Sequence, residues 1–288
     1  MSTIPQWFVQ QWDTAVRTEA SQKDSRLLAA VTDRGTISGE SFTVNFMADD
    51  GSLLDANSVR HGDTVLSETE HQARIATMSD FYKAYPLDRN DIPKMLVNPV
   101  TGGDYMKLLM AAKNRRIDDI IYNAARGSVL KKDGTSTALP STQKIAVGAT
   151  GFTKAKLIAA RKIFRRNECD QHNDEELNIV YNDEMLDDIL SDTTLTSADF
   201  MAVKMLQEGD VSKRWMGFNW IPFNGITKVT NDYFTIAWAK SGIHFGKGYE
   251  EGNVSKRPDK KDLWQASMGA SYGAARQDEK KCVEIAFL

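Results

Sequence analysis

Histidines and neighbouring carboxylates are the first residues of this chain whose types could support chemistry. His61 and His71 lie close in sequence to Asp63, Glu68 and Glu70. Imidazole and carboxylate groups at this spacing would form a metal site if two strands folded back on each other. The simpler interpretation places both histidines in a solvated polar segment. We therefore expect no metal site here.

Cysteine and paired acids are the second possibility. Cys169 follows a cation-rich segment, which could lower the pKa of its thiol, and His172 lies three residues further on. The acidic pairs at 118–119 and 187–188 could act as acid and base. Adjacent helical residues point about 100° apart, however, so a solvated face is favoured. We expect no catalytic residue and no cofactor, because the sequence contains no nucleotide-binding, hydrolase or zincin motif.

Composition describes an ordinary globular chain. Its 288 residues are 41% hydrophobic and 26% charged, with 36 Lys and Arg against 39 Asp and Glu, a net charge of −3. A chain of this length buries about three quarters of its extended surface on folding. The charge balance excludes a protein that coats nucleic acid with cations. Cys169 and Cys282 form no CxxC pair, and no segment has the apolar length of a signal peptide or membrane span. We expect a chain that is not exported, with no membrane partner.

The first part of the chain is expected to project from any core. Residues 4–31 carry apolar side chains at roughly helical spacing and predict a helical arm. Its Trp7 and Trp12 are costly to leave in water, so the arm is expected to dock on its own domain or on a neighbouring subunit. Residues 35–81 alternate apolar and polar around a turn at 49–51 and predict a long β-hairpin that is too poor in large apolar residues to bury a core alone.

One long helix and a charge discontinuity follow. Apolar residues at three- and four-residue steps predict a helix over 104–126, about 35 Å long, with Asp104 as its N-cap and Gly127 as its C-cap. Residues 151–167 then hold six cations and no anion, on a segment that predicts a helix. Residues 168–192 hold ten anions and no Lys or Arg.

The remaining segments mix strands and short helices. The patterns predict a strand over 177–181, helices over 183–190 and 197–206, and sheet over 215–238 and 268–288. Helices and strands occur in separate runs, which favours an α+β fold.

Short motifs over nearly the whole chain carry a family resemblance. They are KNRRIDDII at 113–121, LQEG at 206–209, WMGFNW at 215–220, AWAKSGI at 237–243, DL at 262–263, SYGAAR at 271–276 and VEI at 283–285. Together with the order of arm, projecting hairpin, long helix, mixed segment and returning sheet, they resemble the major capsid protein of tailed bacteriophages, which has the Hong Kong 97-type fold.

The resemblance implies an organisation of the chain. It places an N-terminal arm at 1–34, an extended loop at 35–82, a peripheral domain at 83–148 and 245–288 that includes a long spine helix, and an axial domain at 149–244. It also implies a virion capsid subunit that self-assembles in the host cytoplasm into pentamers and hexamers of an icosahedral shell enclosing packaged double-stranded DNA.

The same resemblance implies partners. These are other copies of the chain, a portal protein and, where the shell carries them, decoration proteins. A separate scaffolding protein is expected, because 288 residues leave no room for a cleaved scaffolding segment. Contacts with the DNA should be weak and non-specific. The alternatives are an encapsulin-like nanocompartment shell with protein cargo, and a cytosolic α+β enzyme with a site around Cys169 and His172.

Surfaces that a monomer would leave unsatisfied become candidates for contacts between subunits. We expect the cationic helix of one copy to meet the acidic strip of the next. The candidate residues are Trp7, Trp12, Phe42, Phe46, Lys154, Arg161, Lys162, Arg165, Arg166, Glu175, Glu176, Asp187 and Asp188. Some members of the family crosslink a lysine of the extended loop to a neighbour. This chain has no lysine between Lys23 and Lys83, so a non-covalent shell is expected.

Overall fold

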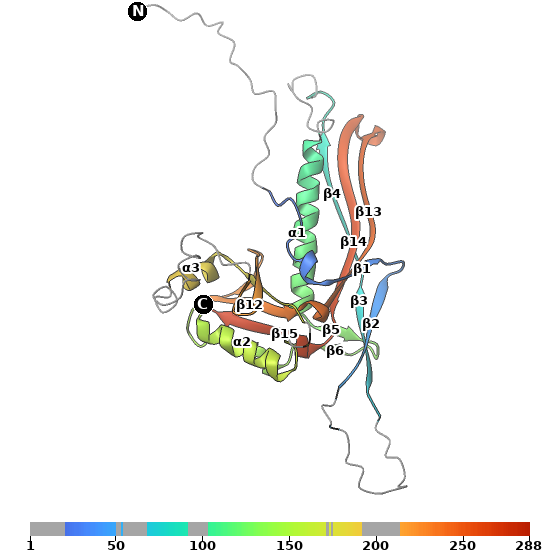
Figure 1. The fold of residues 1–288 in the computed structure, drawn as a ribbon. Helices are drawn as coiled ribbons and strands as arrows, with labels where there is room; N and C mark the ends of the chain where they lie inside the picture. The colour runs from blue at the N-terminus through green and yellow to red at the C-terminus, as the bar shows by residue number, and fades with distance from the viewer. Residues whose placement is uncertain are drawn as a thin grey trace, which may run out of the picture.

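The computed structural model describes residues 21–49, 53, 68–91, 103–170, 173, 175–191 and 214–288. In this part of the chain, three helices lie against three sheets whose strand pairs are mainly antiparallel (Figure 1). The α+β character predicted from the sequence is confirmed. Of the predicted elements, the turn at 49–51 is described only at Asp49, and the helix over 197–206 lies outside the described residues.

The longest helix is α1, Asp104–Arg126, with the bounds predicted from the sequence. Its N-cap is Gly103 in a left-handed conformation (φ 79°), so the expectation that Asp104 caps the helix is wrong. Asp104 is instead the first helical residue, where a carboxylate interacts favourably with the helix dipole. Gly127 is the C-cap as expected, and its N–H donates to the Asn123 carbonyl over 2.7 Å. A Cβ at Gly127 would lie 2.8 Å from that oxygen.

A four-stranded sheet packs along α1 (Figure 1). Its strands, in spatial order, are β1 (Thr32–Thr36), β13 (Ile243–Arg257), β14 (Leu263–Arg276) and β4 (Ser79–Leu87). β13 and β14 form one long hairpin, and β4 is an edge strand. Ile117, Ile121 and Tyr122 of α1 belong to the same buried cluster as Phe245 and Tyr272 of the sheet.

A seven-stranded sheet forms the second layer. In spatial order it contains β7 (Lys144–Ile145), β15 (Cys282–Phe287), β12 (Asp232–Ala239), β8 (Leu177–Tyr181), β10 (Phe218–Pro222) and β9 (Arg214–Trp215), and β11 (Lys228–Val229) pairs with β12. The helices α2 (Lys154–Arg166) and α3 (Asp183–Ser191) share one buried cluster with this sheet. The other face of this sheet carries Val180, Ile236 and Trp238, which belong to the same buried cluster as residues of α1.

The third sheet carries the projecting hairpin. It consists of β2 (Ser41–Met47), β3 (His71–Thr77), β5 (Val129–Lys131) and β6 (Ser136–Thr137). β2 and β3 pair antiparallel from Ser41↔Thr77 to Met47↔His71, which confirms the predicted hairpin within the described residues. Figure 1 shows it extending away from the end of the molecule where the β13–β14 hairpin turns.

Short 3-10 turns connect these elements. They are η1 (Leu28–Ala30), η3 (Ser141–Gln143), η5 (Lys240–Gly242), η6 (Pro258–Lys260) and η7 (Glu279–Lys281). Two of them connect the seven-stranded and the four-stranded sheet: β12 continues through η5 into β13, and β14 returns through η7 into β15. The sequence-based boundary at residue 245 groups β15 with β13 and β14, whereas its hydrogen bonds join it to β12 and β7.

Candidate intersubunit surfaces

The described part of the N-terminal arm is held by one buried carboxylate. Asp118 of α1 has no exposed surface, so the prediction that it lies on a solvated face is wrong. Its oxygens accept hydrogen bonds from the Arg26 and Leu27 backbone N–H groups (3.1 and 3.0 Å), the Ser25 hydroxyl (2.6 Å) and the Gln22 side-chain amide. A buried carboxylate needs such compensation, because an unpaired one would carry a large desolvation cost.

This carboxylate also explains why the predicted helical arm is wrong within 21–31. Backbone N–H groups that would donate along a helix donate to Asp118 instead, and the only regular element is the single turn η1. Leu27 and Val31 are buried in the cluster beneath α1. The candidates Trp7 and Trp12 lie outside the described residues.

Phe42 and Phe46 of β2, the two candidate contact residues in the projecting hairpin, pack against their own chain. Phe42 is half-buried and packs on a small cluster of Ala76, Val129 and Ala275. The Phe46 ring lies 5.2 Å from the guanidinium carbon of Arg74, within the range of a cation–π contact. Both rings therefore help to fix the base of the hairpin, whatever further contacts they make.

Cations on α2 divide into internal and external groups. Lys156 is buried, and its ammonium donates to the carbonyls of Val147, Thr150 and Gly151, so it does not belong to a cationic surface. Desolvation lowers its pKa, although the nearby carboxylates of Asp188 and Asp232 oppose the shift.

Arg161 also has an internal partner. It donates to the Met216 carbonyl over 2.9 Å and packs on Gly217, where φ is +84° and a Cβ would lie 3.0 Å from the guanidinium carbon. Together with Arg165, it lines a polar cavity of about 620 Å³ at the end of α2.

The outward face of α2 remains cationic. Lys154, Lys162, Arg165 and Arg166 are exposed, and Ile158 between them keeps 49% of its surface exposed. Arg165 lies 3.8 Å from Asp170. Within the described residues, no ion pair or hydrogen bond involves the side chains of Lys154, Lys162 or Arg166.

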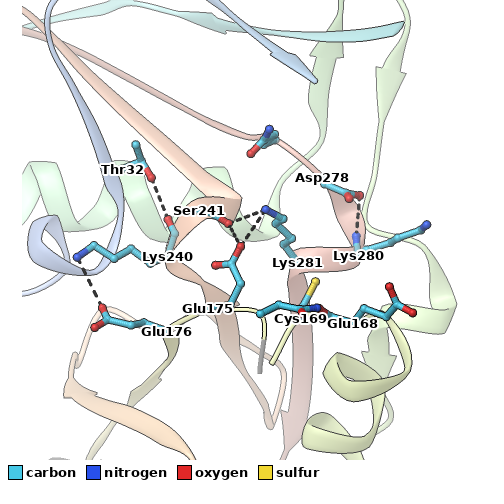
Figure 2. A network of polar contacts seen from close by, with 12 residues as sticks. Thr32, Glu168, Cys169, Glu175, Glu176, Lys240, Ser241, Asp278, Lys280 and Lys281 are labelled. Carbon is cyan, nitrogen blue, oxygen red and sulfur yellow. Dashed lines mark hydrogen bonds and ion pairs between the residues drawn. The ribbon is translucent and has the colours of Figure 1, made fainter. Parts of the chain in front are cut away.

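Two of the acidic candidates are engaged inside the subunit (Figure 2). The Ser241 hydroxyl donates to Glu175, and the Lys281 ammonium donates to both Glu175 (3.1 Å) and Ser241 (2.6 Å). Glu176 is more exposed and lies 3.6 Å from the Lys240 ammonium. The network joins the start of β8 to the two crossings η5 and η7.

The other two acidic candidates lie on α3. Asp188 accepts a short hydrogen bond (2.5 Å) from the Phe152 backbone N–H, just before α2 begins. A Cβ at the preceding Gly151 would lie 2.5 Å from the same carboxylate. Asp187 is exposed, and no hydrogen bond or ion pair within the described residues involves its carboxylate. Asp183 and Glu184 are exposed beside it, so α3 presents an acidic outer face.

The residues considered for catalysis do not form a site in the described structure. Cys169 is 6% exposed and burial raises the pKa of its thiol to about 11, so the preceding cations do not activate it as a nucleophile. Cys282 is fully buried, and both thiols are free. His71 is exposed at the start of β3, while His61 and His172 lie outside the described residues. Among the described residues no cluster of His, Cys, Asp and Glu could hold a metal ion, and no helix is long and apolar enough to cross a membrane.

Two buried arginines are the main feature that sequence reasoning missed. Arg276 of β14 donates to the carbonyls of Ala125 and Gly127 (2.8 and 2.9 Å), which caps the end of α1. Arg74 of β3 pairs with Glu279 at 3.0 Å. The only signal for Arg74 was its place at an inward position of the alternating β3 pattern, two residues from buried Ala76.

Solved structures define the class to which this fold belongs. The chain is similar to a structure from Mycobacterium phage Che8, with a TM-score of 0.66 at 12% identity over 98% of both chains. It is also similar to the capsid of cyanophage Pam1 (TM-score 0.70, 11% identity, 99% of this chain and 98% of that one) and to the capsid of Ralstonia phage GP4 (TM-score 0.70, 8% identity, 99% and 96%). The fold is that of phage capsid proteins.

The family follows from the sequence as well. A family profile described as phage capsid protein matches residues 4–288, so the chain belongs to the phage capsid protein family. No curated protein sequence matches it. The resemblance to a phage major capsid protein is confirmed, and the protein is a structural component of a bacteriophage capsid shell.

Proposed function

We propose that this chain is a major capsid protein whose copies form pentamers and hexamers of an icosahedral shell around packaged double-stranded DNA. In this proposal the fold is of the Hong Kong 97 type. The seven-stranded sheet with α2 and α3 forms most of the axial domain, and α1 with the four-stranded sheet forms most of the peripheral domain. The protein has a structural role and no catalytic one.

The observation that carries the proposal is the charge separation between α2 and α3. The two helices pack into one cluster on the seven-stranded sheet, yet α2 carries six cations and no anion, and α3 carries four anions and no cation. The side chains of Lys154, Lys162 and Asp187 point to no partner among the described residues. A cyclic ring of identical subunits brings one face of each copy against a different face of the next. The two helices offer such a pair of faces.

The magnitude of these contacts defines their role. Exposed ion pairs contribute about 0–1 kcal/mol each, so they would orient neighbouring subunits more than hold them. Exposed Ile158, in the middle of the cationic face, would add a small apolar contact. We therefore expect ring formation to weaken as ionic strength rises, since salt screens exposed charges.

The other expected partners belong to the same proposal. A near-neutral net charge of −3 suits a shell that holds DNA without binding it tightly. A separate scaffolding protein would direct assembly in the host cytoplasm, and a portal protein and, in some shells, decoration proteins would join the shell.

Electron microscopy of the purified protein, followed by extraction of any enclosed nucleic acid, tests the proposal. Uniform icosahedral particles that contain double-stranded DNA when isolated from infected cells support it. Featureless monomers at high concentration with scaffolding protein would contradict it. Particles that enclose protein and no nucleic acid would favour the encapsulin-like alternative.

A charge exchange tests the contact between α2 and α3. The double variant Lys154→Glu and Lys162→Glu avoids Arg161, whose guanidinium has an internal role. We expect it to fold but to yield few rings or shells, because like charges would face each other. Adding Glu184→Lys and Asp187→Lys in the same chain should restore assembly. Unchanged particle yield from the first variant would show that α2 does not contact a neighbouring copy.

The absence of loop lysines leads to a further expectation. With no lysine between Lys23 and Lys83, the shell should dissociate into single chains on a denaturing gel. A ladder of covalent oligomers would contradict this.

A further inference from the structure

A groove lies between α1, the edge strand β4 and the neighbouring strand β14. It encloses a cavity of about 330 Å³, and we call it the α1–β4 groove. Its apolar lining includes Leu109 and Ala112 of α1 together with Met268 and Ala270 of β14. Ligand pockets span about 300–1,000 Å³, so this one suits a single large side chain better than a folded element.

The groove stays open because β4 ends the sheet. Every β4 residue from Ser79 to Leu87 pairs with β14, and no strand among the described residues pairs with its other edge. Tyr82 of β4 keeps 66% of its surface exposed at the rim, although its hydroxyl accepts a hydrogen bond from Gln265. An aromatic ring exposed beside an apolar cavity is typical of a surface that another group covers.

The charge on the rim indicates the kind of group that would fit. Lys83, Arg115 and Arg116 are exposed and line the groove, and the Arg116 guanidinium carbon already lies 4.8 Å from the Phe81 ring centroid. Within the described residues, no hydrogen bond or ion pair involves the Arg115 side chain. A rim of cations beside apolar lining favours an aromatic ring with a carboxylate next to it.

The chain itself carries such a group a few residues before its described part begins. Trp12 and Asp13 are adjacent in the sequence, nine and eight residues before Ser21. Ser21 and Gln22 line a second cavity, of about 470 Å³, whose wall also includes Arg115. The described chain therefore begins in a cavity that shares Arg115 with the α1–β4 groove. Nine extended residues span up to about 30 Å, more than is needed to pass one side chain.

We propose that the α1–β4 groove binds Trp12 of the same chain, with the Asp13 carboxylate beside Arg115. Of the two destinations that the sequence left open for the arm, this assigns Trp12 to its own subunit. A tether of nine residues gives an effective concentration in the millimolar range, which favours the chain's own tryptophan over a free competitor. The proposal does not depend on shell formation.

Crosslinking of the full chain tests the proposal. Gln11→Cys, which keeps Trp12 and Asp13, combined with Ala112→Cys should form an intrachain disulfide on mild oxidation, while the native thiols at Cys169 and Cys282 stay buried. Asn123→Cys replaces Ala112→Cys in the matched control, because Asn123 is exposed on α1 eleven residues away. We expect about tenfold more crosslinked monomer from the first pair than from the control. Equal yields would overturn the proposal, and covalent dimers would show that the arm of a neighbouring copy fills the groove.

Limited proteolysis supplies a second measurement on a chain with its native cysteines. Trypsin cleavage after Arg17, between Trp12 and Ser21, should be several-fold faster in Trp12→Ala and in Arg115→Glu than in the unchanged chain. Trp7→Ala should cleave at the unchanged rate. If Trp7→Ala accelerates cleavage and Trp12→Ala does not, the groove holds a different part of the arm. Neither result depends on whether particles form, so a failure here is distinguishable from a failure of the capsid proposal.

Discussion

The seven-stranded sheet and the outer half of the β13–β14 hairpin are both antiparallel over most of their length, yet they are stabilised differently. All five residues of β8 are buried, and Trp238 of β12 has no exposed surface. Most residues of β13 from Tyr249 to Arg257 are exposed, although each pair of the ladder from Glu250↔Ala270 to Arg257↔Leu263 is formed. The first region is stabilised by an enclosed core, and the second mainly by backbone pairing. The second therefore exposes most of the side chains of its outer β13 segment, whereas β8 of the first exposes none.

Two tryptophans should show the largest contrast between these regions. Trp238→Ala should reduce the free energy of unfolding by about 3–5 kcal/mol, because it empties a fully buried site. Trp264→Ala in the hairpin removes a half-buried ring under Lys256 (5.0 Å) and should cost about 1 kcal/mol. Denaturant unfolding of the unassembled chain measures both. Equal losses would show that the hairpin has a core of its own.

The next largest loss of stability is expected from a substitution at Asp118, the buried carboxylate that holds the arm. Asp118→Asn keeps the size of the side chain but weakens its accepted hydrogen bonds, and should cost about 1.5–3 kcal/mol. The adjacent Asp119→Asn is the control, because Asp119 is half-exposed and, among the residues that the structure describes, pairs only with Arg116 and Asn123 of α1. Thermal unfolding that ranks Asp119→Asn above Asp118→Asn would contradict the assigned role.

The two thiols should make stability depend on pH at the alkaline end. Burial raises the folded-state pKa of Cys169 to about 11 and of Cys282 to about 12, against roughly 8.5 for an exposed thiol. A raised folded-state pKa favours the protonated thiol, so this contribution is complete below about pH 8.5 and is lost as the pH rises through 11 to 12. Unfolding curves from pH 7 to 11 should show the decline, and it should be smaller in Cys169→Ala. A thiol reagent that modifies both cysteines rapidly in the folded chain at pH 8 would refute this.

The smallest loss of stability is expected from a substitution at Glu250, where the β13–β14 hairpin contacts α1. The Lys113 ammonium lies 2.6 Å from a carboxylate oxygen of Glu250, and the Tyr272 hydroxyl donates a hydrogen bond to the other oxygen. Burial alone would raise the pKa of Glu250, but these two partners outweigh it and lower the pKa. A lowered pKa adds stability above the unfolded-state value of about 4.3, and that stability is lost as the pH falls through the folded-state pKa. Glu250→Gln should therefore cost up to about 1 kcal/mol at pH 7 and almost nothing near pH 3. A cost that stays constant with pH would show that the charge of Glu250 is not involved.

The sequence predicted the elements that carry a clear local pattern. The periodicity of α1, the buried run of β8 and the cationic amphipathic segment of α2 each determine their structure within a few residues. The outer part of β13 gave no such signal. Its sequence, from Gly248 to Arg257, is rich in glycine and charge, and it forms a strand because β14 supplies the partner backbone. Pairing of this kind is a tertiary effect that overrides local preference.

The candidate surfaces were predictable in charge but not in exposure. Sequence reasoning treats the six cations of α2 as equivalent, although the Lys156 ammonium is buried against three carbonyls and the Arg161 guanidinium donates to the β9–β10 turn. The sequence likewise could not distinguish buried Asp118 from half-exposed Asp119, because neighbours on a helix differ only in direction. Long-range contacts decide which charges remain available to a partner.

The place of β15 has a consequence for how the chain folds during its synthesis. Residues 282–287 follow every other strand in the sequence, yet they lie between β7 and β12 and supply Val283, Ile285 and Phe287 to the main cluster. At about 5–20 residues per second, a ribosome needs roughly 15–60 s to make the residues that precede this strand. During that time the seven-stranded sheet lacks an inner member, and α2 and α3 pack on an incomplete layer. A nascent chain is therefore poorly suited to premature assembly.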